Sequence, residues 1–392
     1  MDKNAGFSYN IQVIRRTARS NAKFMFKGVI NNKMESTVNQ KDTKTYHEQK
    51  YVDNTLRLRS ILKTLPAFAR DYFRAVEPTT SARTRISYAY DIRVFFHFLM
   101  ENNPFYKDYS IDQFTLQDLE RLEPVDIEEY QEYLKVYEND DKRQITNTEK
   151  GLARKMSALR SFYGYYYKRQ AISKNPTLLV DMPKLHEKAI IRLDTDEVAK
   201  LLDYVDHGAD HLTGQRRAYY EKTKNRDLAI LTLLLGTGIR VSECVGLDLQ
   251  DVDFKNNGIK VTRKGGNEMV VYFGDEVAEA LKTYMYTTRK ATLPLPGHEN
   301  ALFLSTQRKR MGVQAVENMV KKYAREVTPN KKITPHKLRS TYGTALYRET
   351  GDIYLVADVL GHKDVNTTKK HYAAIDENRR RKAAGAVKLR EV

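Results

Sequence analysis

Residues 225–240 have the sequence NRDLAILTLLLGTGIR, and this stretch decides how the second half of the chain folds. From Leu228 to Leu235 it is almost entirely apolar, so a helix formed here has no polar face and is expected to be deeply buried. Gly236 and Gly238 follow, and glycine tolerates the left-handed backbone angles at which helices end. The sequence therefore predicts a buried helix and a glycine turn, with the charged side chain of Arg240 just beyond it.

The clearest strand patterns come directly after this helix. Three short runs are rich in β-forming residues, at Val252–Phe254, Ile259–Thr262 and Met269–Phe273. Turns rich in asparagine and glycine separate them. A polar segment at 206–222 precedes the buried helix and is expected to interrupt the helical pattern. The remaining periodic segments are predicted to be helices, at about 195–205, 275–290, 312–326, 335–349, 353–360 and 367–374. We therefore expect a mainly α fold with a small antiparallel β-sheet.

The first half of the chain is predicted to be helical from about residue 51. One helix is expected after the capping residues Thr79–Ser81, another at 124–137, and a third at 150–169. This last helix, KGLARKMSALRSFYGYYYKR, combines an apolar face with many cations, which are our candidate contacts to DNA phosphates: Arg154, Lys155, Arg160, Lys168 and Arg169. An ordinary solvated helix face explains the same pattern equally well.

These patterns divide the chain into five segments. Residues 1–50 are polar and basic, and we expect a flexible extension there. A helical domain at 51–180 and a mixed domain at 193–376 are joined by a proline-containing linker at 181–192. Residues 377–392 are a basic tail, which is suited to gripping phosphates.

Composition limits the class of protein further. The chain has 392 residues, 41% of them apolar, and no apolar run reaches the roughly 18 residues that a membrane span needs. A formal net charge of +17 favours a polyanionic partner, either nucleic acid or an anionic membrane surface, although a solvated basic surface without such a partner remains an alternative. The single cysteine, Cys244, excludes an intrachain disulfide and is interpreted as a packing residue, which favours a cytoplasmic protein.

Four separated segments combine cations, imidazoles and a tyrosine: GTGIRVSEC (236–244), TRKGGN (262–267), TPHKLRSTYGT (334–344) and LGHKDVNTTKKHY (360–372). In the third, Thr334 can cap a helix whose first residue is Pro335. His336 and Arg339 then lie three residues apart, on one face of the first turn. Because helix N-termini attract anions, this pair is well placed to hold a phosphate.

Each of these residues alone has an ordinary structural explanation. Arg240 can form an ion pair with Glu243 or Asp227, and Lys264 can be a solvated turn lysine. Tyr372 is one of 26 tyrosines. Only the ordered set points to a specific chemistry.

Taken in order, the four segments resemble the tyrosine recombinase (phage integrase) family, whose pattern is Arg, Lys, His-x-x-Arg, His and Tyr. The resemblance covers about residues 51–380 and looks closest to the Xer-type recombinases, in particular the XerS-like branch. It implies a two-domain, C-shaped clamp on double-stranded DNA, acting as a homotetramer on two inverted-repeat sites. It also implies that the tail at 377–392 docks in a neighbouring subunit, as an alternative to gripping phosphates. One departure is the spacing of His362 and Tyr372, which is ten residues here, whereas nine is usual in Xer proteins and ten is common in integrases of mobile elements.

The resemblance assigns most of the cations to the scissile phosphate. Arg240 and Arg339 would clamp its non-bridging oxygens, and His336 and His362 would donate hydrogen bonds to them as charge builds. Glu243 would support Arg240. Arginine suits this task because its planar fork matches two phosphate oxygens.

The covalent chemistry is assigned to two further residues. Tyr372 would attack the phosphorus to give a 3′-phosphotyrosyl link, and Lys264 would protonate the departing 5′ oxygen. A tyrosine hydroxyl titrates near ~10, so cationic neighbours must assist its deprotonation. We expect no metal and no cofactor, because charged side chains take the place of a metal and the sequence shows no acidic cluster suited to magnesium.

Three alternatives stay open at this point. A non-catalytic DNA-binding regulator could keep the same fold, and an enzyme like the type IB topoisomerases could use similar chemistry without a partner site. Within the recombinases, integration or excision of a mobile element competes with the resolution of chromosome dimers. The ten-residue spacing favours the first use, and the N-terminal helical pattern favours the second.

Overall fold

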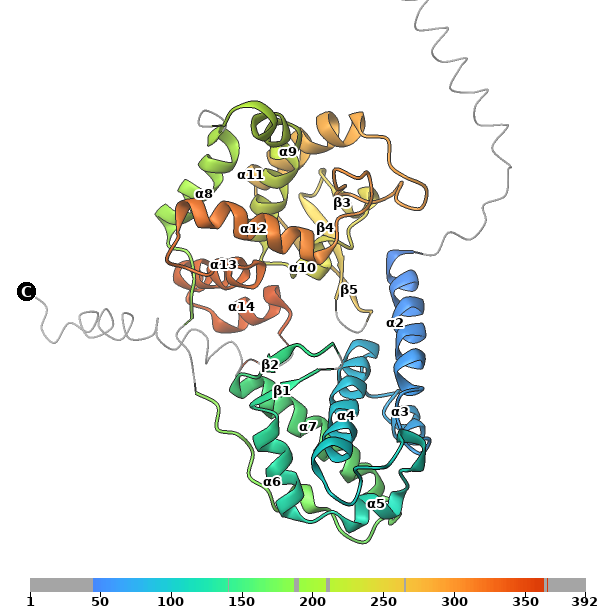
Figure 1. The fold of residues 1–392 in the computed structure, drawn as a ribbon. Helices are drawn as coiled ribbons and strands as arrows, with labels where there is room; N and C mark the ends of the chain where they lie inside the picture. Colours follow the sequence, from blue (N-terminus) through green and yellow to red (C-terminus); the bar gives the residue numbers. More distant parts are fainter. Residues whose placement is uncertain are drawn as a thin grey trace, which may run out of the picture. The chain divides into compact units, whose positions relative to one another are not determined.

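A computed structural model describes residues 45–139, 141–186, 190–208, 212–263 and 266–362, together with Val365. The expected extension at 1–50 lies almost wholly outside these residues, as do the helix expected near 367–374 and the tail at 377–392. The described part is mainly helical, with two small antiparallel sheets (Figure 1). This is the predicted fold class, while the domain boundaries remain predictions.

The first group of elements packs around one apolar cluster rich in aromatic rings. Its elements are α2 (Tyr46–Leu62), α3 (Ala69–Ala75), α4 (Ala82–Asn102), α5 (Leu116–Arg121), α6 (Pro124–Tyr133), β1 (Val136–Glu138), β2 (Gln144–Thr146) and α7 (Glu149–Lys168). Helices α4 and α7 lie side by side (Figure 1), and Phe95, Phe162 and Tyr163 are fully buried in the cluster. The predicted cap of α4 is confirmed, because the Ser81 hydroxyl accepts a hydrogen bond from the Thr84 N–H at 3.2 Å.

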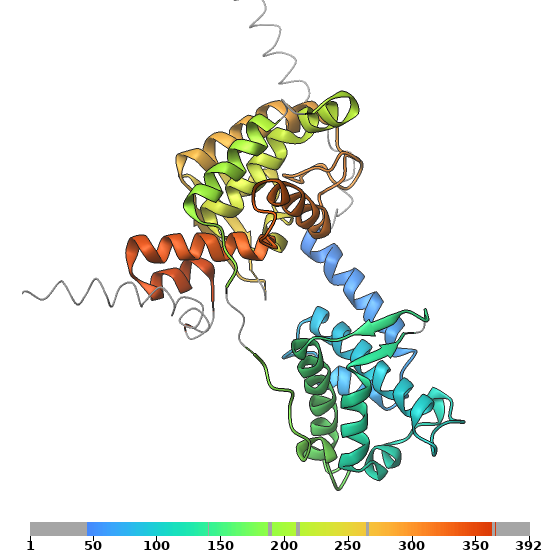
Figure 2. The same cartoon turned by 60° about the vertical axis from the view of Figure 1, so that its left-hand side comes forward.

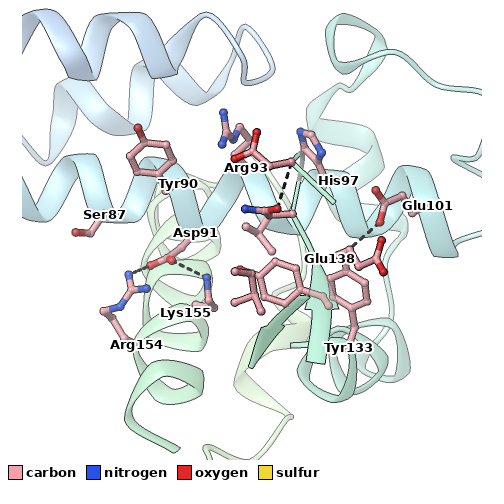
Figure 3. Close-up of a pocket in the computed structure, with 15 residues that line it drawn as sticks. Ser87, Tyr90, Asp91, Arg93, His97, Glu101, Tyr133, Glu138, Arg154 and Lys155 are labelled. Atoms are coloured by element: carbon pink, nitrogen blue, oxygen red, sulfur yellow. Dashed lines mark hydrogen bonds and ion pairs between the residues drawn. The ribbon is translucent and has the colours of Figure 1, made fainter. Parts of the chain in front are cut away.

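The basic helix α7 differs from its prediction in where its cations point. Lys155 was expected on an exposed basic face, but it is buried and forms an ion pair with Asp91 of α4 at 3.2 Å, which the Arg154 guanidinium also contacts (Figure 3). Arg160 donates one hydrogen bond to the Thr177 carbonyl at 3.0 Å and another to the Val180 carbonyl. A buried carboxylate needs a cationic partner, so Asp91 draws cations of α7 toward the protein interior. The periodicity of α7 alone cannot show this, because Asp91 lies on another helix.

The second group of elements surrounds helix α9 (Gly214–Thr237). It comprises α8 (Thr195–His207), α10 (Val241–Cys244), β3 (Val252–Asp253), β4 (Gly258–Thr262), β5 (Glu268–Tyr272), α11 (Asp275–Tyr284), α12 (Val313–Val327), α13 (Pro335–Thr350) and α14 (Ile353–Leu360). Helix α9 packs against α8, α11 and α13, and the strands form an antiparallel sheet in the order β3–β4–β5. Helices α13 and α14 lie side by side (Figure 2), joined by a short turn at Gly351.

Helix α9 is buried where predicted but begins earlier than expected. The polar segment that was expected to interrupt the pattern is helical from Gly214 onward. Its residue Tyr220 is buried and donates a hydrogen bond to the Val205 carbonyl at 2.7 Å, so tertiary contacts hold this polar part in place. The helix ends at Gly238, which adopts the predicted left-handed conformation with φ +63°.

Cys244 is fully buried, and burial raises the pKa of its thiol to about 12. A thiol that stays protonated is a poor nucleophile, so the interpretation of Cys244 as a packing residue is confirmed. Within the residues that the structure describes, no helix is long and apolar enough to cross a lipid bilayer.

Candidate active site

The glycine turn after α9 brings three elements together. At Gly238 an added Cβ atom would lie 2.4 Å from the Tyr342 ring of α13 and 2.9 Å from the Leu360 side chain of α14. Glycine is therefore required here for close packing as well as for its positive φ. Arg240 follows two residues later, at the N-terminal end of α10.

Arg240 is held by the buried carboxylate of Glu243. The Glu243 carboxylate accepts hydrogen bonds from the Arg240 backbone N–H and from its guanidinium Nη1, both at 2.8 Å. Glu243 is only 3% exposed at its side chain, whereas Arg240 keeps 35% exposure. The other carboxylate considered for Arg240, Asp227, pairs with Arg226 at 2.7 Å. Glu243 thus fixes the direction of a guanidinium that a ligand can still reach.

Arg339 is more deeply enclosed. It is 4% exposed and donates from Nη1 to the Gly238 carbonyl at 2.6 Å and from Nη2 to the Leu360 carbonyl. Helix α13, which carries it, begins at Pro335 as predicted, although the Thr334 side chain forms no capping hydrogen bond. His336 lies exposed in the first turn of the same helix.

The C-terminal end of α14 is the point where the cations converge. Three successive carbonyl oxygens there accept hydrogen bonds from three arginines of different elements: Val359 from Arg263 at 2.8 Å, Leu360 from Arg339, and Gly361 from Arg240 at 3.2 Å. The last carbonyls of a helix lack intrahelical partners and carry the negative end of its dipole, so they attract cations. His362 is the next residue, and its backbone N–H donates a hydrogen bond to the Ala357 carbonyl at 2.9 Å.

The structure thus brings together four of the predicted site residues: Arg240, Glu243, Arg339 and His362. Lys264 and Tyr372 lie outside the described residues, so the general acid and the nucleophile stay predictions. The proposed DNA contacts on α7 belong to the first group of elements, where Lys168 and Arg169 are exposed.

Sequence analysis missed Arg263 as part of this site. Arg263 stands beside Lys264 in the quoted string TRKGGN, but a single arginine at a strand end has no pattern of its own. Gly361 adopts φ +61° and forms the left-handed turn that ends α14. This turn follows from the sequence, because a glycine directly after a helix that ends at Leu360 indicates a sharp change of direction before His362.

The arrangement is suited to binding an oxyanion. Guanidiniums present parallel N–H donors to two oxygens at once, and a partly buried site strengthens each contact. Among the described residues, no three His, Cys, Asp or Glu side chains are grouped so that they could hold a metal ion.

Comparisons with known proteins place this fold and site in a family. Residues 192–379 match the model described as the phage integrase family. The tyrosine recombinase XerC of Caldanaerobacter subterraneus subsp. tengcongensis is 34% identical over 319 residues, covering 80% of this chain and 83% of the relative. The tyrosine recombinase XerD of Staphylococcus epidermidis is 35% identical over 223 residues, covering 56% of this chain and 70% of the relative.

Solved structures agree at the level of the fold. XerH recombinase bound to a palindromic difH substrate matches with a TM-score of 0.57 at 17% identity, covering 77% of this chain and 78% of that one. The Tn1549 transposon integrase in complex with transposon right-end DNA also matches with a TM-score of 0.57, at 20% identity, covering 81% of this chain and 98% of that one. The chain belongs to the phage integrase family of tyrosine recombinases. Xer recombinases are among its relatives, which confirms the predicted resemblance to the Xer type, while the XerS-like branch stays a prediction.

Proposed function

We propose that this protein is a site-specific recombinase that cuts and rejoins double-stranded DNA through a 3′-phosphotyrosyl intermediate. The observation that carries the proposal is the convergence of Arg240 and Arg339, with the turn of His362, on one end of α14. These residues match the family pattern in order and type. DNA-bound recombinases and integrases among the solved structures of the same fold support DNA as the partner.

In the proposed reaction the scissile phosphate replaces water in front of Arg240 and Arg339. Tyr372 gives up its phenolic proton to solvent water, and its oxygen forms a bond to phosphorus while the bond from phosphorus to the 5′ oxygen breaks. Lys264 donates a proton to that departing oxygen, which leaves as a 5′-hydroxyl. Rejoining reverses each step with the 5′-hydroxyl of a second strand, so the energy of the phosphodiester is stored and no ATP is needed.

The arginines contribute mainly by stabilising charge. The pentavalent transition state carries more negative charge on its non-bridging oxygens than the ground state does, so donors fixed in advance bind it better. Glu243 keeps Arg240 in position before the substrate arrives, which avoids the cost of ordering the side chain during the reaction. His336 and His362 would add hydrogen bonds to the same oxygens.

We further propose that the enzyme works in the cytoplasm as a tetramer on two inverted-repeat sites, with the helical domain and the catalytic domain forming a C-shaped clamp. The net charge of +17 supports close contact with phosphates. At the C-terminal end of α7, the exposed Lys168 and Arg169 are the better candidates for contact with DNA phosphates. Arg154 stays a candidate, because its side chain is 47% exposed. The biological use is either mobile-element transfer or dimer resolution.

Trapping the intermediate tests the proposal. The purified protein is incubated with fragmented genomic DNA of its host that carries random single-strand nicks, since a nick beside the cut releases a short end and prevents rejoining. Protein boiled in detergent should retain DNA, and sequencing that DNA identifies the site and its biological context. Protein that binds DNA tightly and retains none after boiling would instead be a non-catalytic regulator. Relaxation of any supercoiled plasmid by monomers would indicate a topoisomerase-like enzyme.

Glu243→Ala is expected to slow formation of the trapped complex by roughly 10- to 100-fold, because Arg240 loses the carboxylate that orients it. The rate is measured at saturating DNA, so that weaker binding does not contribute. Glu268→Ala is the matched control, since it removes an exposed carboxylate from β5 that pairs with the half-exposed Lys260 at 3.5 Å. Equal rates for Glu243→Ala and the control would show that Arg240 needs no orienting partner.

A further inference from the structure

Arg263, at the end of β4, is the third arginine on the α14 carbonyls and has no role in the reaction described so far. Its Nη2 donates to the Val359 carbonyl at 2.8 Å. Its guanidinium also lies directly against Gly361, where an added Cβ atom would come within 1.5 Å of Nη1 and 2.4 Å of Cζ. No side chain other than hydrogen fits at Gly361 while Arg263 stays in place, so the two residues are matched to each other.

This contact is a poor source of stability. The Nε and Nη1 atoms of Arg263 are buried and have no hydrogen-bond partner among the residues that the structure describes. Burial lowers the pKa of the Arg263 guanidinium and the nearby Arg240 cation lowers it further, while the Glu243 carboxylate opposes both. Buried donor atoms without partners usually weaken a fold, so another reason for the presence of this half-buried cation is needed.

The position of Arg263 between two candidate catalytic groups supplies that reason. It directly precedes Lys264 in the chain, and consecutive Cα atoms are only about 3.8 Å apart. Gly361, on which its guanidinium rests, directly precedes His362. The contact therefore ties the exit of β4 to the turn that ends α14, and this turn is also held by Arg240 through the Gly361 carbonyl.

We propose that Arg263 is a positioning residue for strand cleavage, which fixes the chain entering Lys264 against the α14 turn so that the general acid meets the phosphate bound by Arg240 and Arg339. The inference rests on the proposed function. It adds that the accuracy of proton delivery to the 5′ oxygen depends on a residue that itself touches neither DNA nor the reacting atoms.

The test uses a substrate that needs no general acid. The DNA recovered by trapping is synthesised with sulfur in place of the bridging 5′ oxygen at the cut. A thiolate is a far weaker base than an alkoxide and leaves without being protonated. On normal DNA, Arg263→Ala should form covalent complex about 100-fold more slowly than the unaltered protein. On the sulfur substrate it should recover to within a few-fold, as Lys264→Ala also should, whereas Arg240→Ala should not.

Two further measurements separate positioning from folding. The melting temperature of Arg263→Ala should stay close to that of the unaltered protein, because the loss of the hydrogen bond to Val359 is offset by the removal of two buried, unsatisfied donor atoms. Lys260→Ala, on the same strand with its side chain 47% exposed, removes one charge without touching α14 and should cleave normal DNA at the unaltered rate. Gly361→Ala should reproduce the slow cleavage of Arg263→Ala by displacing the guanidinium, and the double variant should be no slower than the slower single variant.

The inference is overturned if Arg263→Ala cleaves normal DNA at the unaltered rate, or if its loss persists on the sulfur substrate. Both outcomes differ from a failure of the proposed function, in which the unaltered protein itself traps no DNA.

Discussion

Tyr372→Phe protein is expected to bind its DNA site with unchanged affinity and to form no detectable covalent complex. The substitution removes one oxygen, which is the atom proposed to bond to phosphorus, and leaves the cationic pocket intact. Loss of a nucleophile usually costs on the order of 10⁴-fold or more, because the remaining donors still bind the phosphate but nothing attacks it. The rate is measured by trapping on the nicked substrate, and affinity by titration of the intact site.

Tyr354→Phe is the matched control for this experiment. Tyr354 lies on α14 and is 71% exposed, so the loss of its hydroxyl should leave cleavage unchanged. Retention of the covalent complex by Tyr372→Phe would mean that another of the 26 tyrosines is the nucleophile, and mapping the DNA-linked peptide would then identify it.

Arg339→Ala should show the second-largest effect, and it should affect both catalysis and stability. The guanidinium binds the Gly238 and Leu360 carbonyls and is proposed to hold the scissile phosphate as well. Removing a transition-state donor costs about 10²–10³-fold in rate, so we expect a loss of about 10³-fold in covalent-complex formation. The free energy of unfolding in urea should fall by about 1–3 kcal/mol, since buried carbonyls lose their partner.

Two variants sharpen the interpretation of Arg339. Arg339→Lys keeps the charge but cannot donate to both carbonyls in the same geometry, so it should remain much slower than the unaltered protein. Arg325→Ala removes an exposed arginine from the neighbouring helix α12 and should change neither the rate nor the stability. An Arg339→Ala protein that is folded at the assay temperature and cleaves normally would exclude this residue from the phosphate site.

Much of the fold could be predicted because periodicity is a local property. The buried helix ending at Gly238, the sheet β3–β5 and helices α12 to α14 all lie close to their predicted bounds. The errors arose where distant contacts decide the structure. Gly214–Lys224 is helical because Tyr220 docks on Val205, and Lys155 is buried because Asp91 lies opposite on α4. The β1–β2 hairpin was missed because the helix predicted at 124–137 extended over Val136 and Tyr137, whereas α6 ends at Tyr133 and these residues pair with β2.

The candidate site was predictable as a set of residues but not as an assembly. Arg240, Glu243 and Arg339 stand in short motifs that become informative when all four motifs are taken in order. The backbone carbonyls that hold these side chains cannot be recognised in the sequence. Every residue has a carbonyl group, and only those at the end of a helix are left available for other donors. Arg263 escaped notice for the same reason, since its importance comes from meeting Gly361 in space.

The use of carbonyls at the end of α14 has an electrostatic consequence. A carboxylate that orients an arginine cancels its charge, whereas a carbonyl offers only a partial negative charge and leaves the cation nearly whole. Three guanidiniums are directed here by one helix end, and Glu243 is the carboxylate seen to bond with one of them. The site thus retains most of its positive potential, so an incoming phosphodiester is attracted by groups whose charge is already in place.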